Sequence, residues 1–165
     1  MPDVRRTLGA VGIHLAILVL VLVPPLWVRS TGTAVFLETE KMDPRALFRG
    51  HYVILGYQLA QRIVADEKRS KPGAGDNTVY VKVTTARPAQ FISVSDRLPD
   101  LAQGEACIVG RRRGRNGSVD FPQIAQYFAA RDEARRLEGL RGDDLLAEVR
   151  TSRGCNAVLL GLVSR

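Results

Sequence analysis

One uncharged stretch near the N-terminus constrains this chain more than any other feature. From Leu8 to Val28 the sequence reads LGAVGIHLAILVLVLVPPLWV, 21 residues without a charged side chain. A helix of that length rises roughly 30 Å at about 1.5 Å per residue, which matches the hydrocarbon thickness of a bilayer. We therefore predict a transmembrane helix over 8–28.

A secretory signal peptide is the main alternative, because Arg5 and Arg6 precede the apolar stretch. A cleaved peptide would end in a small-x-small pattern, whereas Pro24, Pro25 and then Leu-Trp-Val-Arg occur here. This favours an uncleaved signal anchor over a cleaved peptide or a buried core helix. The two prolines are expected to end or kink the helix, and Trp27 fits an interfacial anchor.

Basic residues at the helix ends set the expected orientation. A short basic tail ahead of a first apolar helix normally stays in the cytoplasm, although Arg29 directly after the helix leaves only a small charge difference. We expect 1–7 to form a cytoplasmic tail, and 29–165 to form a domain outside the cytoplasm. The predicted location is the inner (cytoplasmic) membrane, with the domain periplasmic or extracellular.

Two features of the predicted helix concern partners. Gly9, Gly12 and Ala16 lie within about 60° of one another at about 100° per residue, so a second helix could pack closely there. His14 points to nearly the opposite side. It could reach toward the head groups, make a polar contact with another subunit, or act as a pigment or metal ligand. The first alternative requires no partner.

Beyond Arg29 the pattern changes to short runs rich in Val, Ile, Tyr, Phe and Thr, separated by Gly, Pro, Asp and Asn, which is typical of strands. A helical spacing of Ala134, Leu137 and Leu140 predicts one short amphipathic helix over 131–140. The expected fold is a single transmembrane helix plus a small mainly-β (α+β) domain with one short helix. The candidate strands are Val35–Thr39, Tyr52–Ala60, Thr78–Thr85, Gln90–Ser95, Ala106–Arg113, Val119–Phe121 with Gln126–Ala129, Leu145–Thr151 and Ala157–Val163.

A basic hairpin is predicted around Asn116-Gly117, because Asn-Gly favours a type I′ turn. The formal net charge of the chain is +7, so an anionic partner has to be considered. The hairpin could contact lipid head groups or a protein, or it could simply be solvated. Nucleic acid is disfavoured, since only 6% of residues are aromatic and the domain is expected outside the cytoplasm. The arginines near the tip are Arg111, Arg112, Arg113 and Arg115.

Catalytic and metal-binding motifs are scarce in this sequence. Cys107 and Cys155 are the only cysteines, and they could form one disulfide in an oxidising compartment or remain two small buried residues. With His14 and His51 the only histidines, we expect no metal site and no cofactor. The sequence has no nucleotide-binding, nucleophile-elbow or zinc-protease motif.

A membrane-bound hydrolase is a further, weaker hypothesis. Membrane-anchored signal peptidases activate a serine just past their helix with a lysine, and Ser30 and Lys82 are the residues that could take those roles. No surrounding motif supports the pair.

The stretch 43–57 carries a distinctive pattern that resembles the signature of the GDYxxLxY family, usually written DPRxLxRGDYxxLxY. Weaker similarity at Tyr127-Phe128 and at Ala157–Leu162 extends the resemblance over roughly 35–163. The residues that carry the motif are Asp43, Pro44, Arg45, Arg49, Gly50, His51, Tyr52, Leu55 and Tyr57.

The resemblance implies a membrane-anchored bacterial protein without a settled activity, of a kind often linked with multi-span membrane proteins. His51 replaces the aspartate of the family motif, which puts in doubt any mechanism that needs a carboxylate there. The motif could serve the fold, a binding surface or catalysis. Tyr52 and Tyr57, five residues apart, would point to opposite faces of one strand.

These observations together predict a non-catalytic, single-pass accessory subunit that stabilises or organises a larger membrane complex, for example a respiratory or photosynthetic one. The expected partners are other membrane protein subunits, with anionic lipid head groups possible and no nucleic acid. A membrane-anchored module that binds a ligand or peptide is the alternative hypothesis.

Overall fold

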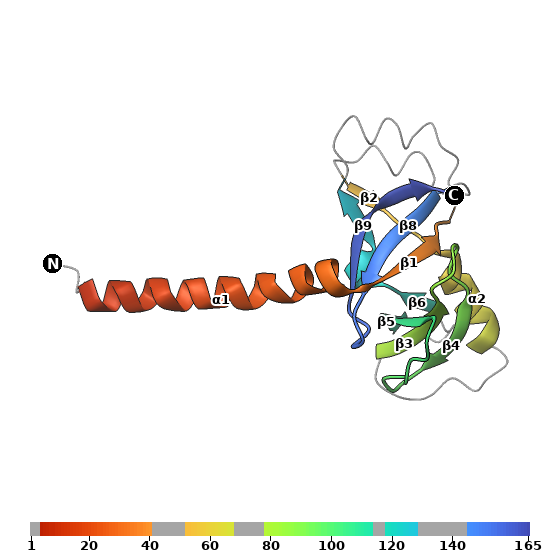
Figure 1. Cartoon of the computed structure of the whole chain (residues 1–165), viewed down its shortest axis with the longest axis horizontal. Helices are drawn as coiled ribbons and strands as arrows, with labels where there is room; N and C mark the ends of the chain where they lie inside the picture. Colours follow the sequence, from red (N-terminus) through yellow and green to blue (C-terminus); the bar gives the residue numbers. More distant parts are fainter. Residues whose placement is uncertain (1–3, 41–51, 68–77, 114–117, 129–144) are drawn as a thin grey trace.

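A long helix runs directly into a β-domain in this protein (Figure 1). The computed structural model describes residues 4–40, 52–67, 78–113, 118–128 and 145–165. The helix α1 (Val4–Thr31) contains the predicted apolar segment and extends it at both ends. It continues past Pro24 and Pro25, so the expectation that it could end at the prolines is wrong. The hydroxyls of Ser30 and Thr31 donate to the carbonyl of Trp27, at 3.0 and 2.8 Å, which stabilises the last turn.

Almost none of α1 is covered by the rest of the chain. In the most apolar 18-residue window of Leu8–Thr31, only 6% of the residues are buried. Its length and composition would allow the helix to cross a membrane, and a signal sequence near the N-terminus has the same two properties.

The described residues of the β-domain form three sheets, and neighbouring strands in each sheet are antiparallel. The first has the order β1-β8-β9, the second is the pair β2-β7, and the third has the order β4-β3-β5-β6. The strands are β1 (Thr33–Glu38), β2 (Tyr52–Ile54), β3 (Thr78–Thr84), β4 (Phe91–Ser95), β5 (Glu105–Arg113), β6 (Ser118–Asp120), β7 (Gln126–Phe128), β8 (Leu145–Thr151) and β9 (Ala157–Ser164).

The core lies where the first and third sheets meet. Alternating residues of β3 are fully buried, because a strand with period 2 turns every second side chain inward. The same alternation holds for Val35 and Leu37 on β1. The cluster continues through Ile63, Val79, Val81, Val83, Ile108, Ile124, Ala147 and Val149. The mainly-β domain predicted from the sequence is therefore confirmed.

The prediction of one strand over Tyr52–Ala60 is wrong in its second half. Strand β2 ends at Ile54, and the helix α2 (Gln58–Glu67) begins soon after Tyr57. Leu59 and Ile63 are both buried and lie four residues apart, which is the helical rather than the strand period. The other strands occur where expected, with shifts of one or two residues at their ends. The helix predicted over 131–140 lies outside the described residues.

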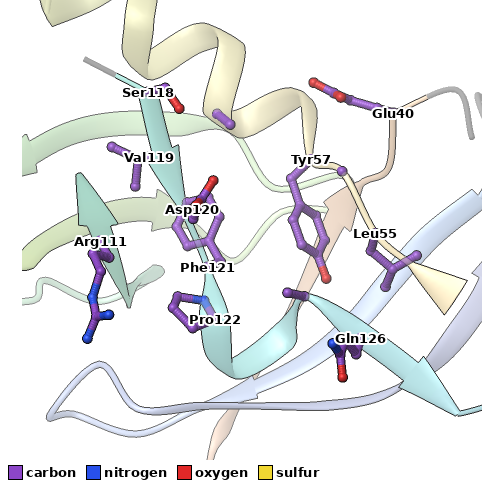
Figure 2. Close-up of a pocket in the computed structure, with 13 residues that line it drawn as sticks. Glu40, Leu55, Tyr57, Arg111, Ser118, Val119, Asp120, Phe121, Pro122 and Gln126 are labelled. Atoms are coloured by element: carbon purple, nitrogen blue, oxygen red, sulfur yellow. The ribbon is translucent and has the colours of Figure 1, made fainter. Parts of the chain in front are cut away.

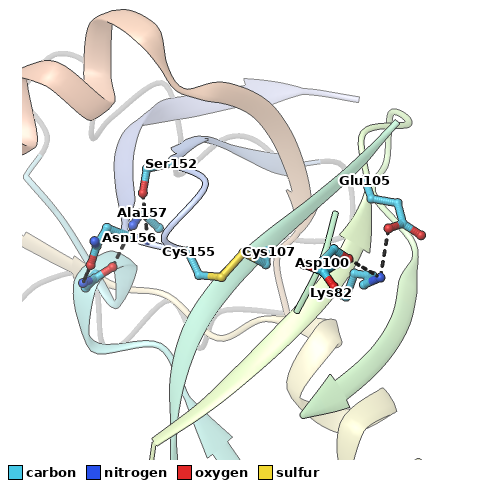
Figure 3. Close-up of a disulfide and its surroundings, with 9 residues drawn as sticks. Lys82, Asp100, Glu105, Cys107, Ser152, Cys155, Asn156 and Ala157 are labelled. Atoms are coloured by element: carbon cyan, nitrogen blue, oxygen red, sulfur yellow. Dashed lines mark hydrogen bonds and ion pairs between the residues drawn. A yellow bond between two sulfur atoms is a disulfide. The ribbon is translucent and has the colours of Figure 1, made fainter. Parts of the chain in front are cut away.

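A disulfide between Cys107 and Cys155 connects two of the sheets (Figure 3). Cys107 lies on β5, and Cys155 lies in the turn between β8 and β9. Both residues are fully buried, and the amide of Val109 donates to the carbonyl of Cys155 at 2.8 Å. Of the two alternatives that the sequence left open for the cysteines, the structure has the bonded one.

The junction between α1 and β1 is a tight contact formed around Gly32. The amide of Gly32 donates to the carbonyl of Val28 at 2.9 Å, and Nη1 of Arg150 donates to the carbonyl of Gly32 at 3.0 Å. A Cβ atom on Gly32 would collide with the carbonyl oxygen of Val28 and lie 2.9 Å from that of Thr151. Both obstacles are backbone atoms, so only glycine fits here without displacing the helix from the sheet.

We expect Gly32→Ala to lower the free energy of unfolding of the β-domain by about 1–3 kcal/mol, because either α1 or β8 has to move. Urea unfolding of the full chain in detergent, followed by near-UV circular dichroism, measures this change. Gly12→Ala is the matched control, since a Cβ at Gly12 meets nothing within 4 Å. Equal stability of Gly32→Ala and the control would contradict the prediction.

Removing the disulfide is expected to lower the free energy of unfolding by about 2–4 kcal/mol, because the bond closes a loop with a sequence separation of 48. The variant that combines Cys107→Ala and Cys155→Ala should therefore unfold at lower urea than the oxidised wild type. Adding a reductant should bring the wild type close to the variant and leave the variant itself unchanged. A wild-type midpoint that does not respond to complete reduction would refute this.

Candidate functional site

The second half of the family-like motif lies at the centre of the domain, between β1 and the turn after β6. The amide of Leu55 donates to the carbonyl of Ala125 at 2.9 Å, and the amide of Glu40 donates to the carbonyl of Gly56 at 2.9 Å. Tyr57 also forms an isolated antiparallel bridge with Thr39. The segment 55–57 thus connects two parts of the chain that are distant in sequence.

Tyr57 fixes the 3-10 turn η1 (Pro122–Ile124) from inside the core. Its hydroxyl donates to the carbonyl of Ile124 at 2.6 Å, and its ring meets the ring of Phe121 edge-on at 6.0 Å between centroids. Burial raises the pKa of the Tyr57 phenol far above its usual value, because the phenolate would lose its hydration. Tyr57 therefore acts as a hydrogen-bond donor and not as a base.

A cavity of about 650 Å³ opens beside this segment (Figure 2). That volume falls within the usual range of small-molecule sites. Glu40 and Arg111 lie on opposite sides, with the rings of Tyr57 and Phe121 between them. The wall is thus aromatic at its centre and charged at its margins. The lining residues are Glu40, Leu55, Gly56, Tyr57, Ala60, Arg111, Ser118, Val119, Asp120, Phe121, Pro122, Ala125 and Gln126.

Sequence reasoning found only part of this site. Leu55 and Tyr57 were marked by the motif, and Arg111 was marked as a hairpin arginine. Glu40, Phe121 and Gln126 were missed, because they come from separate segments that only the tertiary fold brings to one cavity. The sole signal for Phe121 is its place in an apolar strand pattern, which indicates a core residue rather than a site.

The first half of the motif lies outside the described residues. That half comprises Asp43, Pro44, Arg45, Arg49, Gly50 and His51. Tyr52 opens β2 and pairs with Phe128 on β7. The expectation that Tyr52 and Tyr57 share one strand is wrong, because β2 ends at Ile54.

The two hairpin arginines whose side chains the structure describes, Arg111 and Arg112, have different surroundings. Strands β5 and β6 pair antiparallel, as the predicted hairpin requires, but Arg113 lies opposite Ser118, whereas a two-residue Asn116-Gly117 turn would place Arg115 there. Arg112 forms an ion pair with Asp96 at 3.1 Å, whereas Arg111 is exposed and borders the cavity. Arg115 lies outside the described residues.

The residues expected to pack against another helix lie in the N-terminal half of α1, away from the β-domain. Gly9, Gly12 and Ala16 are exposed, and a Cβ at either glycine would meet nothing within 4 Å. Nδ1 of His14 lies 2.8 Å from the carbonyl of Ala10, one helical turn earlier. The structure brings none of these residues to the cavity.

Ser30 and Lys82, the residues of the hydrolase hypothesis, have separate partners. Ser30 bonds to Trp27 within α1. Nζ of Lys82 donates to the carbonyl of Asp100 at 2.8 Å and to Glu105 at 2.9 Å (Figure 3). The pKa of Glu105 is held below its usual value, first by the amide of Ala102 and then by Lys82. Each of the two residues thus bonds to groups other than its proposed catalytic partner.

Fold and site together define a class of protein, a β-domain carried on one long apolar helix, with a motif segment buried at its centre. The family model for the GDYXXLXY protein matches residues 14–162, and the chain therefore belongs to the GDYXXLXY family. Comparisons with curated proteins and with solved structures give no match. Among the residues that the structure describes, no group of three or more His, Cys, Asp or Glu could hold a metal ion.

Tyr57→Phe is expected to destabilise the domain by about 1–3 kcal/mol, because the buried carbonyl of Ile124 loses its donor. Urea unfolding at neutral pH measures the loss. Tyr80→Phe on β3 is the control, since Tyr80 is only partly buried.

The same comparison has a defined pH dependence. Folding raises the pKa of Tyr57, so its contribution is complete below the unfolded value of about 10 and declines as the pH rises above it. The stability advantage of the wild type over Tyr57→Phe should shrink above that pH. A constant difference up to strongly alkaline pH would contradict this.

Proposed function

We propose that this protein is a non-catalytic, single-pass accessory protein of the bacterial inner membrane, whose helix and extra-cytoplasmic β-domain stabilise a larger membrane protein complex. The observation that carries the proposal is the apolar surface of α1, which is uncovered along its length and firmly joined to a folded domain.

The exposed surface of α1 is too costly to leave in water. Most of its large apolar side chains are about half exposed or more. Covering one such side chain contributes roughly 1 kcal/mol, so a dozen of them amount to about 10 kcal/mol, comparable with the whole stability of a small domain. Lipid or the helices of other subunits would supply the missing cover. The residues are Leu8, Val11, Ile13, Leu15, Ile17, Leu18, Val19, Leu20, Val21, Leu22, Val23, Leu26 and Trp27.

The end of α1 supports an anchor rather than a removable leader. Val28 and Gly32 are buried against the domain, and the guanidinium of Arg150 binds the carbonyl of Gly32. A peptidase acting here would need this backbone to be free and extended. No small-x-small pattern occurs between Pro24 and Arg29, which points in the same direction.

The disulfide supports a position outside the cytoplasm. Stable structural disulfides form in oxidising compartments such as the periplasm, and are rare where glutathione and thioredoxin keep thiols reduced. Cys107 and Cys155 are fully buried, which is typical of a structural bond. This agrees with the orientation that the basic N-terminal tail favours.

A ligand- or peptide-binding module is the second candidate, and the cavity at Tyr57 favours it. The cavity has a suitable volume and combines aromatic with charged wall residues. Yet the hydroxyl of Tyr57 already donates a hydrogen bond to the carbonyl of Ile124, so this tyrosine stabilises the fold and its proton is not free to bind a ligand. We therefore rank this function second.

The proposal is tested by mild solubilisation of cells that produce the full chain, followed by native gel electrophoresis and mass spectrometry of what migrates with it. We expect other membrane proteins to co-migrate in a defined complex, and Gly9→Leu combined with Gly12→Leu to weaken it. Leu18→Ile, which keeps the apolar character of α1, is the control. A monomer that carries a bound small molecule would favour the second candidate instead.

The orientation is tested by a reporter fused after Arg165. An enzyme that is active only outside the cytoplasm should be active in the fusion. Reporter activity confined to the cytoplasm would reverse the proposed placement of the domain.

A further inference from the structure

We propose that the end of the β-domain next to α1 binds the phosphate groups of anionic lipids, through Arg29 and Arg153 beside Trp27. This inference rests on the proposed insertion of α1 into a membrane. It assigns lipid binding to this end of the domain rather than to the arginine hairpin, for which lipid contact was one of the alternatives left open by the sequence.

Arg29 is placed at the expected depth of the lipid phosphates. It is the first charged residue after the 21 uncharged residues Leu8–Val28, which span roughly 30 Å as a helix. Its side chain is exposed. Trp27, two residues earlier, is 66% exposed, and tryptophan concentrates at the boundary between hydrocarbon and head groups.

The strand topology places the turn that contains Arg153 at the end of the domain next to Arg29. Strand β1 begins where α1 ends, and Thr33 pairs with Thr151. Because β8 runs antiparallel to β1, the turn 152–156 that follows β8 lies at the end of the sheet that adjoins α1. Figure 1 shows the connection between β8 and β9 beside the last turns of α1. Arg153 is exposed in this turn.

The turn that carries Arg153 is held in one conformation. The amide of Cys155 donates to the carbonyl of Ser152 at 2.9 Å, and the amide of Ser152 donates to the carbonyl of Asn156 at 2.9 Å. The disulfide fastens the same turn to β5 (Figure 3). A fixed turn loses little conformational entropy when its arginine binds a phosphate.

The charges at this end of the domain are unbalanced. The segments 4–37 and 149–165 contain no Asp or Glu. Within the described ranges, neither Arg29 nor Arg153 has an ion-pair partner, whereas Arg112 is paired with Asp96. Two unpaired guanidinium groups beside a membrane anchor complement the phosphates of anionic lipids.

Arg150 has a different part in this arrangement. Its Nη1 is bound to the carbonyl of Gly32, and its Nε is buried with no hydrogen-bond partner among the described residues. It therefore positions the junction between α1 and β8, and with it the turn of Arg153, rather than reaching the lipids itself.

Trp27 provides a direct test, because it is the only tryptophan in the sequence. The full chain is reconstituted into phosphatidylcholine vesicles that contain increasing fractions of brominated phosphatidylglycerol or, in parallel, brominated phosphatidylcholine. Bromine quenches tryptophan emission at short range, so quenching reports which lipid lies next to Trp27. We expect half-maximal quenching at a several-fold lower fraction of the anionic lipid.

Substitutions test which arginines produce the preference for the anionic lipid. Arg29→Gln and Arg153→Gln should each reduce the preference by up to roughly five-fold, equivalent to about 1 kcal/mol for each arginine, and together they should abolish it. Arg97→Gln, an exposed arginine in the loop after β4, is the matched control and should retain the wild-type preference.

Three outcomes would overturn the inference, and they are distinguishable. Equal quenching by the two brominated lipids would exclude an anionic lipid site while leaving α1 in the bilayer. A preference that survives the double substitution but disappears in Arg111→Gln would assign lipid binding to the hairpin. Quenching by neither lipid would show that Trp27 is outside the bilayer, and would overturn the proposed membrane anchor as well.

Discussion

The contact around Gly32 is the constraint on which the rest of this structure depends. At this residue the last turn of α1 meets β8, with backbone oxygens of Val28 and Thr151 too close to admit any side chain. Arg150 closes the contact by donating to the carbonyl of Gly32. Because β1 begins one residue later, the direction of α1 sets the direction of the first strand, and hence of the sheet β1-β8-β9.

Two internal links then fix the rest of the domain to that sheet. The disulfide joins β5 to the turn after β8, and Tyr57 joins the motif segment to η1. Each link joins parts of the chain that are distant in sequence, and the disulfide, because it is covalent, also restricts the unfolded chain. The family motif is therefore, in its described half, a structural element first. The cavity beside it is enclosed by the elements that the motif holds in place.

The sequence predicted those features of the fold that depend on residues close together in the chain. The apolar stretch, the alternation on β1 and β3 and the antiparallel pairing of β5 with β6 could be predicted, because each depends on neighbours within a few residues. The helix α2 was missed because the alternation of Val53, Leu55, Tyr57 and Leu59 continues into it. Only the burial of Leu59 and Ile63 on one face shows the helical period. No sequence pattern around Glu40 or Gln126 marks either as a cavity residue. Only the tertiary fold brings them to the cavity wall.

The sequence by itself determined that this chain has one helix long and apolar enough to cross a membrane, and a mainly-β domain behind it, since length, hydropathy and period 2 act within each segment. It also carried enough of the motif for the family to be assigned. Only the tertiary structure decided that Cys107 bonds to Cys155, that Tyr57 hydrogen-bonds within the core, and that the connection between β8 and β9 lies beside the end of α1. Those outcomes depend on how antiparallel strands bring distant residues together, and pairing between distant segments leaves no mark in the composition of either one.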